Sequence, residues 1–292
     1  MSDLILGVDV SDAIARLAIV TADGDVVTQG IVAAVRANAI RDAARKAVAA
    51  AKGKVGAVAI AVPSPHEAIA EDLLDAFGGM GKSKPAVITA GNAAAIAEQW
   101  RGAARGAKHV ISFSIAEHVT AGVLINGKSF MGAHGVASSI GWLALNPVER
   151  EDYRRLGGLE AEVAAAGIVR RFVWRIKSGD DSRVADQVKG DFTKISAADI
   201  LQGARSGDGV SISVMRDTGK YIGMAVANLA TMFDPEIIVL GGIIASSGDV
   251  MLEAIRAETA RRMMPQQADQ IRIVLSTLGD DAVAIGAARS LA

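Results

Sequence analysis

The 292-residue sequence predicts an α/β protein built from two similar lobes that meet near residue 106. Two observations lead to this prediction. Each half opens with short apolar runs joined by a hairpin signal, which is Asp23-Gly24 in the first half and Asn126-Gly127 in the second. Each half then alternates helical and strand patterns, as sheets covered by helices do. No short sequence repeat accompanies this echo, so the halves agree in element order only.

Apolar runs and turn residues define the elements of the first half. Strands are expected at Leu4–Val10, Ala15–Val20, Val26–Ile31, Val55–Val62 and Ala86–Thr89. Helices are expected at Ile40–Ala51, Ser64–Phe77 and Asn92–Arg105. The second of these helices carries three start signals in the stretch Ser64-Pro65-His66-Glu67: a Ser N-cap, a Pro at the first helical position and a Glu at the third.

The second half repeats this order and adds more helix. Its expected strands are Val110–Phe113, Val119–Ile125, Lys128–Phe130, Ile237–Leu240 and Ile271–Leu275. Its expected helices are Leu159–Ile176, Ala197–Arg205, Val210–Phe233 and Ala282–Leu291. The polar stretch Ser178–Lys194 is interpreted as an exposed insertion.

The composition excludes several classes of protein. Lys plus Arg number 31 and Asp plus Glu 32, so the formal net charge of -1 excludes nucleic-acid binding driven by bulk positive charge. The absence of Cys excludes disulfide scaffolds and thiolate metal sites. No apolar run approaches the ~20 residues of a membrane helix. Because the first residues lack a basic segment typical of a signal peptide, we expect a cytoplasmic protein with no membrane partner.

Two positions at strand ends are candidates for a binding site. Asp9 ends a buried strand, where its carboxylate serves either a Mg²⁺-nucleotide or the backbone of a turn. Gly241-Gly242 follows the strand Ile237–Leu240, where it permits either close approach of a ligand or a tight turn into a helix. The residues alone leave both alternatives open.

The histidines do not indicate a metal site. His66, His109, His118 and His134 include no pair at i, i+4, and no Cys accompanies them. Glu117-His118 is either an acid/base pair or a solvated turn, and the turn is preferred because adjacent side chains rarely converge. The residues therefore predict a two-lobed protein with a cleft and no metal.

Several stretches resemble the ROK family of sugar kinases and repressors over nearly the whole length. The most specific is Asn228–Gly242, and the others are Ala93–Glu98, Leu124–Lys128, Ile140-Gly141, Gly158–Ala161, Gly279–Ala282 and Ile285–Ala288. The resemblance implies two ribonuclease-H-like lobes of the actin/hexokinase-like ATPase fold, with an interlobe cleft for ATP and a sugar. It places the lobes at residues 1–105 and 106–292, with the last helix packing back on the first lobe.

On the nucleotide side the resemblance implies a vestigial site. The family's first phosphate loop, Asp-x-Gly-Gly-Thr, corresponds to residues 9–13, where Asp12 adds a carboxylate. Its glycine-rich second loop corresponds to residues 116–122, of which only the last glycine is kept. The residues assigned to this vestigial nucleotide site are Asp9, Asp12, Glu117, His118, Gly241 and Gly242.

On the sugar side the resemblance assigns no catalytic residue. Ala90 occupies the position of the family's catalytic Asp and cannot accept a proton. The loss of such a general base lowers the reaction rate ~10²–10⁴-fold. Ser139 replaces a sugar-binding Glu, and Trp142 replaces a His that binds sugar or zinc in relatives. The family's Cys-rich zinc segment corresponds to residues 154–158 without a Cys, so no metal is expected. The vestigial sugar site comprises Thr89, Asn92, Ser139, Trp142 and Glu160.

Three functional hypotheses follow from the resemblance. The first is a pseudokinase that has lost phosphotransfer, needs no cofactor and acts as a ligand-sensing or partner-binding protein. The alternative is an active, glucokinase- or fructokinase-like enzyme that uses ATP and Mg²⁺ with a rewired base. The third is a repressor, but the first strand at Leu4 leaves no room for a DNA-binding extension, so no nucleic-acid partner is expected. A small-molecule ligand in the cleft and a homodimer are the expected associations.

Overall fold

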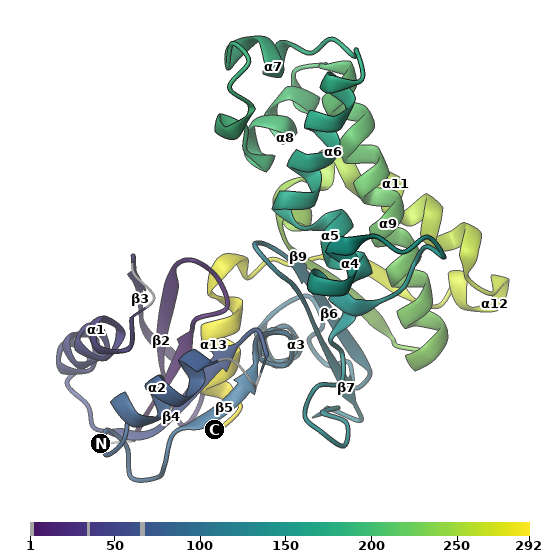
Figure 1. The fold of residues 1–292 in the computed structure, drawn as a ribbon. Coiled ribbons are helices and arrows are strands. Elements are labelled where there is room, and N and C mark those ends of the chain that lie inside the picture. The colour runs from purple at the N-terminus through teal and green to yellow at the C-terminus, as the bar shows by residue number, and fades with distance from the viewer. Residues whose placement is uncertain (1–2, 34–35, 65–67) are drawn as a thin grey trace.

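The computed structural model describes residues 3–33, 36–64 and 68–292, which form two lobes, each built on a five-stranded sheet (Figure 1). Of the three helix-start signals in the stretch 64–67, those at Pro65 and Glu67 lie outside the described residues. Within the described residues, every helix is too short or too polar to cross a membrane.

The first sheet has the strand order β3-β2-β1-β4-β5. Its strands are β1 (Leu4–Asp9), β2 (Ala15–Thr21), β3 (Val26–Val32), β4 (Val55–Val62) and β5 (Ala86–Thr89). β1 pairs antiparallel with β2 and parallel with β4. Helices α1 (Ala37–Ala50) and α2 (Ala68–Ala76) cover one face, where Leu6 packs with Ile40 and Leu73. β1 is buried throughout, and apolar as far as Val8, because its other face is covered as well.

The second sheet repeats this topology with the order β10-β9-β6-β7-β8. Its strands are β6 (Val110–Ile115), β7 (Val119–Ile125), β8 (Lys128–Ser129), β9 (Ile237–Gly242) and β10 (Arg272–Leu275). In both sheets the first three strands form an antiparallel meander. The fourth strand pairs parallel with the other edge of the first, and the fifth pairs parallel with the fourth. The echo in element order therefore reflects a repeated sheet, as the sequence predicts.

Most helices belong to the second lobe and cover one face of its sheet (Figure 1). They are α4 (Glu151–Leu156), α5 (Gly158–Val163), α6 (Ala165–Lys177), α7 (Arg183–Gln187), α8 (Ala197–Arg205), α9 (Gly209–Phe233), α10 (Ile243–Ser246), α11 (Gly248–Arg262) and α12 (Pro265–Ala268). Short 3-10 turns occupy Ile140–Trp142, Phe192–Lys194 and Gly279–Asp281.

Two sequence-based expectations for this lobe are wrong. The single helix expected at Leu159–Ile176 is two helices, because Ala164 adopts an extended backbone between α5 and α6. The stretch Ser178–Lys194 is not simply an exposed insertion. It contains α7, whose Val184 is buried in the core, and the carboxylate of Asp208 accepts a hydrogen bond from the Ser182 hydroxyl.

Two small-residue helices join the lobes (Figure 1). These are α3 (Ala90–Arg101) and the C-terminal α13 (Ala282–Arg289), which packs on β1, β2 and β4 of the first sheet. A Cβ on Gly286 of α13 would lie 1.7 Å from the carbonyl oxygen of Ala93 in α3. A Cβ on Gly91 would lie 2.0 Å from the carbonyl oxygen of Ala121 in β7. The lobes therefore meet through direct backbone contact, and the ends of their central strands face one another.

Candidate functional site

Two cavities meet at the turn between β6 and β7. The first has a volume of about 350 Å³ and lies between the lobes. The second has a volume of about 290 Å³ and lies beside the start of α3. His118 in this turn and Thr120 at the start of β7 line both cavities, so this part of the chain separates one binding space from the other.

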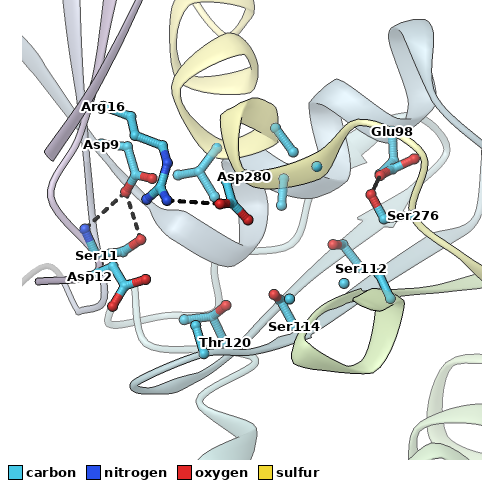
Figure 2. Close-up of a pocket in the computed structure, with 18 of the residues that line it drawn as sticks. Asp9, Ser11, Asp12, Arg16, Glu98, Ser112, Ser114, Thr120, Ser276 and Asp280 are labelled. Atoms are coloured by element: carbon cyan, nitrogen blue, oxygen red, sulfur yellow. Dashed lines mark hydrogen bonds and ion pairs between the residues drawn. The ribbon is translucent and has the colours of Figure 1, made fainter. Parts of the chain in front are cut away.

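Carboxylates outnumber Lys and Arg side chains in the lining of the first cavity. Figure 2 shows Asp9 at the end of β1, Asp12 after it, Glu98 from α3 and Asp280 from the approach to α13 around one space. Arg16 is the single Lys or Arg among the described lining residues, and its Nη2 lies 3.0 Å from Oδ2 of Asp280. This balance of charge opposes the approach of a polyphosphate.

Asp9 closes the turn after β1 and also faces the first cavity. Its side chain is 2% exposed, and Oδ1 accepts hydrogen bonds from the amide of Ser11 (2.9 Å) and from the Ser11 hydroxyl (2.6 Å). Burial raises the pKa of Asp9, while these hydrogen bonds and the charge of Arg16 oppose the rise. The contacts of Asp9 are therefore those of a turn residue. The positive charge that influences its carboxylate is that of Arg16.

Glu98 is a site residue that the sequence analysis missed. It is 1% exposed, and its Oε1 accepts a hydrogen bond of 2.5 Å from the hydroxyl of Ser276, which follows β10 in the second lobe. Its Oε2 accepts from the amide of Ala103 at 2.8 Å. Glu98 thus ties α3 to the loop that walls the first cavity. The signal was available, because Glu98 directly follows the Ala-rich run 93–97, and a carboxylate buried with such a run needs a partner.

The glycine pair at the end of β9 is explained by the chain itself. Gly242 has a φ of 62°, and a Cβ there would lie 2.0 Å from the carbonyl oxygen of Ile115. The tight strand-to-helix turn into α10 therefore requires glycine without any ligand. Gly241 and Gly242 also line the first cavity, so the turn doubles as one of its walls.

In the second cavity, Glu160 and His118 form a fixed pair. Oε1 of Glu160 lies 3.1 Å from Nδ1 of His118, and its Oε2 accepts a hydrogen bond of 3.1 Å from the amide of Val119. The expectation of a solvated turn at Glu117-His118 is met, because both residues are exposed. His118 also contacts Glu160 of α5, because the fold brings together residues that lie 42 positions apart.

Other sugar-side positions divide between the cavity wall and the scaffold. The side chain of Trp142 is 60% exposed and lines the second cavity. Ser139 lines it too, but its hydroxyl donates to the carbonyl of Val136 at 2.7 Å. Its neighbour Ser138 has a left-handed φ of 69°, which is costly for a residue with a Cβ. Because the Ser139 hydroxyl is engaged by the backbone, Trp142 is the side chain in the segment 138–142 that is available to contact a ligand.

Two predicted site residues at the start of α3, Ala90 and Asn92, are buried and line neither cavity. The expectation that Ala90 faces the cleft is wrong, because Ala90 is completely buried. Its neighbours Thr89 and Gly91 line the second cavity instead. Thr89 caps α3 by accepting from the amide of Asn92. Asn92 is also completely buried, and its Oδ1 accepts from the amide of Val123 at 3.3 Å.

The segment beside Trp142 is held by an ion cluster whose groups do not suit a metal. The carboxylate of Glu162 is 2% exposed and lies within 3.4 Å of the guanidinium groups of Arg150, Arg170 and Arg171. The hydroxyl of Tyr153 donates to it at 2.5 Å, and burial together with Glu162 raises the pKa of Tyr153. Guanidinium groups are not metal ligands. The described residues contain no group of three or more His, Cys, Asp or Glu suited to a metal.

Comparison with known proteins relates the chain to one family. The model described as the ROK family matches residues 5–292. A glucokinase of Halalkalibacterium halodurans is 32% identical over 200 residues, which cover 67% of this chain and 59% of the enzyme. A xylose repressor of Caldicellulosiruptor bescii is 28% identical over 201 residues, or 49% of its length. The matched region is therefore only about half to three-fifths of each curated relative.

Solved structures share the fold over almost the whole chain. A ROK glucokinase from Streptomyces griseus in complex with glucose and AMPPNP has a TM-score of 0.79 and 24% identity, with 98% of each chain covered. A ROK family transcriptional regulator, a homologue of the E. coli MLC protein, has a TM-score of 0.82 and 21% identity, with 99% of this chain and 77% of the regulator covered. The fold is that of the actin/hexokinase-like sugar kinases.

Proposed function

The chain belongs to the ROK family, and from that premise we propose that it binds a small carbohydrate-class ligand without transferring phosphate to it. In this proposal the protein acts as a ligand-sensing or partner-binding member of a family whose curated relatives include glucokinases and repressors. The ligand occupies the second cavity, and the first cavity is a vestige of the nucleotide site.

One contrast between the two cavities carries the proposal. The second cavity keeps Glu160 with both carboxylate oxygens engaged, by His118 and by the amide of Val119, so this wall is preorganised for polar recognition. The first cavity presents four carboxylates, and its one Arg is already paired with Asp280.

Phosphoryl transfer depends on positioning and on neutralisation of charge around the phosphates. Asp12 and Asp280 bring negative charge into the space where phosphates would lie, and the charge of Arg16 is shared with Asp280. Ala90 supplies no base, and its position is completely buried. The proposal therefore includes no cofactor and no catalytic metal.

A second candidate, an active sugar kinase that uses ATP and Mg²⁺, is favoured by one observation. His118 lines both cavities, and its Nδ1 is oriented by Glu160. A histidine held by a carboxylate is the arrangement that a general base requires. If phosphotransfer takes place, we expect His118 rather than Ala90 to accept the proton of the sugar hydroxyl.

A coupled assay with Mg·ATP over a panel of hexoses and amino sugars separates the two candidates. The proposal expects calorimetric binding of at least one sugar and no turnover. Turnover near ~1 s⁻¹, within the usual range for enzymes, contradicts it. If that turnover is abolished by His118→Ala but not by His109→Ala, the active kinase replaces the proposal.

Two further associations are part of the proposal. The near-neutral formal charge of -1 supports a protein without a nucleic-acid partner, since such binding depends mainly on positive charge. The homodimer expected from the resemblance stays a prediction. Light scattering at micromolar concentration tests it, because a particle of one chain, 30.0 kDa, contradicts the dimer.

A further inference from the structure

We propose that the second cavity selects an anionic sugar, meaning a single sugar ring that carries a phosphate or a carboxylate. In this assignment Trp142 stacks against the ring and Arg155 binds the anionic group. The inference rests on the proposed carbohydrate-binding function and adds the chemical class of the ligand.

The charges that line this cavity point to an anion. Arg155 lines the cavity from α4 and makes no hydrogen bond or ion pair with any described residue. Glu160 is the single carboxylate among the described lining residues, and its two oxygens already accept from His118 and Val119. A guanidinium group binds phosphate or carboxylate through two parallel hydrogen bonds. The cavity thus holds one positive group for which the described residues supply no partner.

The neighbouring residue shows that this arrangement is specific to position 155. Arg154 lies on the same helix, but its Nε and Nη2 donate to Glu149 at 2.7 and 2.8 Å, and it lines neither cavity. One of two consecutive arginines is therefore used in a surface ion pair, and the other is left at the cavity wall.

The helix that carries Arg155 is itself fixed in place. Tyr153 of α4 donates to the buried Glu162 of α5, and Asp152 of α4 forms an ion pair with Arg170 of α6. These contacts hold α4 against the second lobe, so a ligand does not have to order the helix on binding. Such preorganisation lowers the entropic cost of recognition.

Trp142 and the size of the cavity indicate a single ring. The indole is 60% exposed at the wall and offers an apolar face to the C–H groups of a sugar. Thr89 and Thr120 add hydroxyl groups to the lining. The volume of about 290 Å³ is at the small end of the range for ligand pockets, which favours a monosaccharide over an oligosaccharide.

Isothermal titration calorimetry of the full chain tests the inference with four probes: glucose, glucose 6-phosphate, glucuronate and inorganic phosphate. We expect at least one of the two anionic sugars to bind about tenfold or more tightly than glucose, and more tightly than inorganic phosphate. The comparison of glucose 6-phosphate with glucuronate identifies which anion the site prefers. Trp142→Ala is expected to weaken all sugar binding.

Arg155→Gln is expected to remove the preference for the anionic sugar, Arg155→Lys to restore part of it, and Arg154→Gln, the matched control, to leave it unchanged. Glucose binding as tightly as both anionic sugars, or equal effects of the two Gln variants, overturns the inference while the proposed function stands. Inorganic phosphate binding as tightly as the sugar phosphate also overturns it. If none of the three probe sugars binds, the inference fails, and the proposed function fails with it only when the whole panel of hexoses and amino sugars also gives no binding.

Discussion

Oε1 of Glu160 and Nδ1 of His118 lie 3.1 Å apart at the point where the two cavities meet. Glu160 belongs to α5, and His118 belongs to the turn between β6 and β7, so this contact fixes the turn against the helix layer of the second lobe. The second carboxylate oxygen holds the amide of Val119, the first residue of β7. The wall between the cavities is therefore set by one side chain.

Glu160→Gln is expected to weaken carbohydrate binding about tenfold. The amide oxygen can still accept from Val119, but the charge-assisted contact with His118 is lost. Calorimetry with the best-binding sugar measures the loss. Glu117→Gln, at an exposed position that lines neither cavity, is the matched control. If the two variants bind the sugar equally tightly, Glu160 does not contribute to binding.

Ala90→Asp alone is expected not to create sugar phosphorylation. The first cavity would keep its carboxylates, and residue 90 does not line the second. Because Ala90 is completely buried, the new carboxylate also has to lose its hydration, which lowers stability. A coupled assay and a thermal melt on the same sample check both outcomes, and phosphorylation of any hexose near ~1 s⁻¹ would refute this prediction.

Glu162→Ala is expected to lower the free energy of unfolding by about 3–5 kcal/mol, as the removal of one partner from a buried ion cluster does. The loss leaves the guanidinium groups of Arg150, Arg170 and Arg171 without their shared carboxylate. Chemical denaturation measures the change. Glu149→Ala, which removes the surface partner of Arg154, should change stability little. Similar losses in both variants would mean that the cluster has no special structural role.

Asp9→Asn is expected to stabilise the protein at neutral pH. Burial raises the pKa of Asp9 above its ordinary 3.8, so the folded state holds the proton more tightly than the unfolded state does. Between 3.8 and the raised pKa, stability therefore falls as pH rises, and above that window the buried charge costs its full amount. The amide oxygen of Asn can still accept from Ser11.

Urea unfolding at a series of pH values tests this sign. The advantage of Asp9→Asn over wild type should shrink and vanish as the pH falls toward 3.8. Asp23→Asn, in the exposed hairpin turn after β2, controls for the loss of one negative charge. An advantage that grows on acidification would contradict the assignment.

The fold could be predicted from sequence because its signals are local. The hairpin signals at residues 23–24 and 126–127 and the apolar runs place the ten strands along the chain close to where the structure has them. The break at Ala164 could not be predicted, because Ala favours helix and only the tertiary packing of α5 and α6 demands an extended backbone there.

Part of the site could be predicted from the sequence, but Glu98 was missed and the contacts between distant residues could not be predicted. The strand ends identify Asp9 and Gly242, and the structure places both on the first cavity. The contact between His118 and Glu160 joins residues 42 positions apart, and that between Glu98 and Ser276 joins residues 178 apart. Such pairs depend on how the lobes and layers pack, which no local pattern encodes.

The central claim is that the nucleotide side of this fold no longer serves Mg·ATP. Isothermal titration of Mg·ATP into the full chain, in the presence and absence of the best-binding sugar, tests it most directly. The account predicts no binding heat up to millimolar nucleotide, because Asp9, Asp12, Glu98 and Asp280 line the cavity with one arginine among them. Micromolar binding of Mg·ATP would contradict it and return the protein to the kinases of its family.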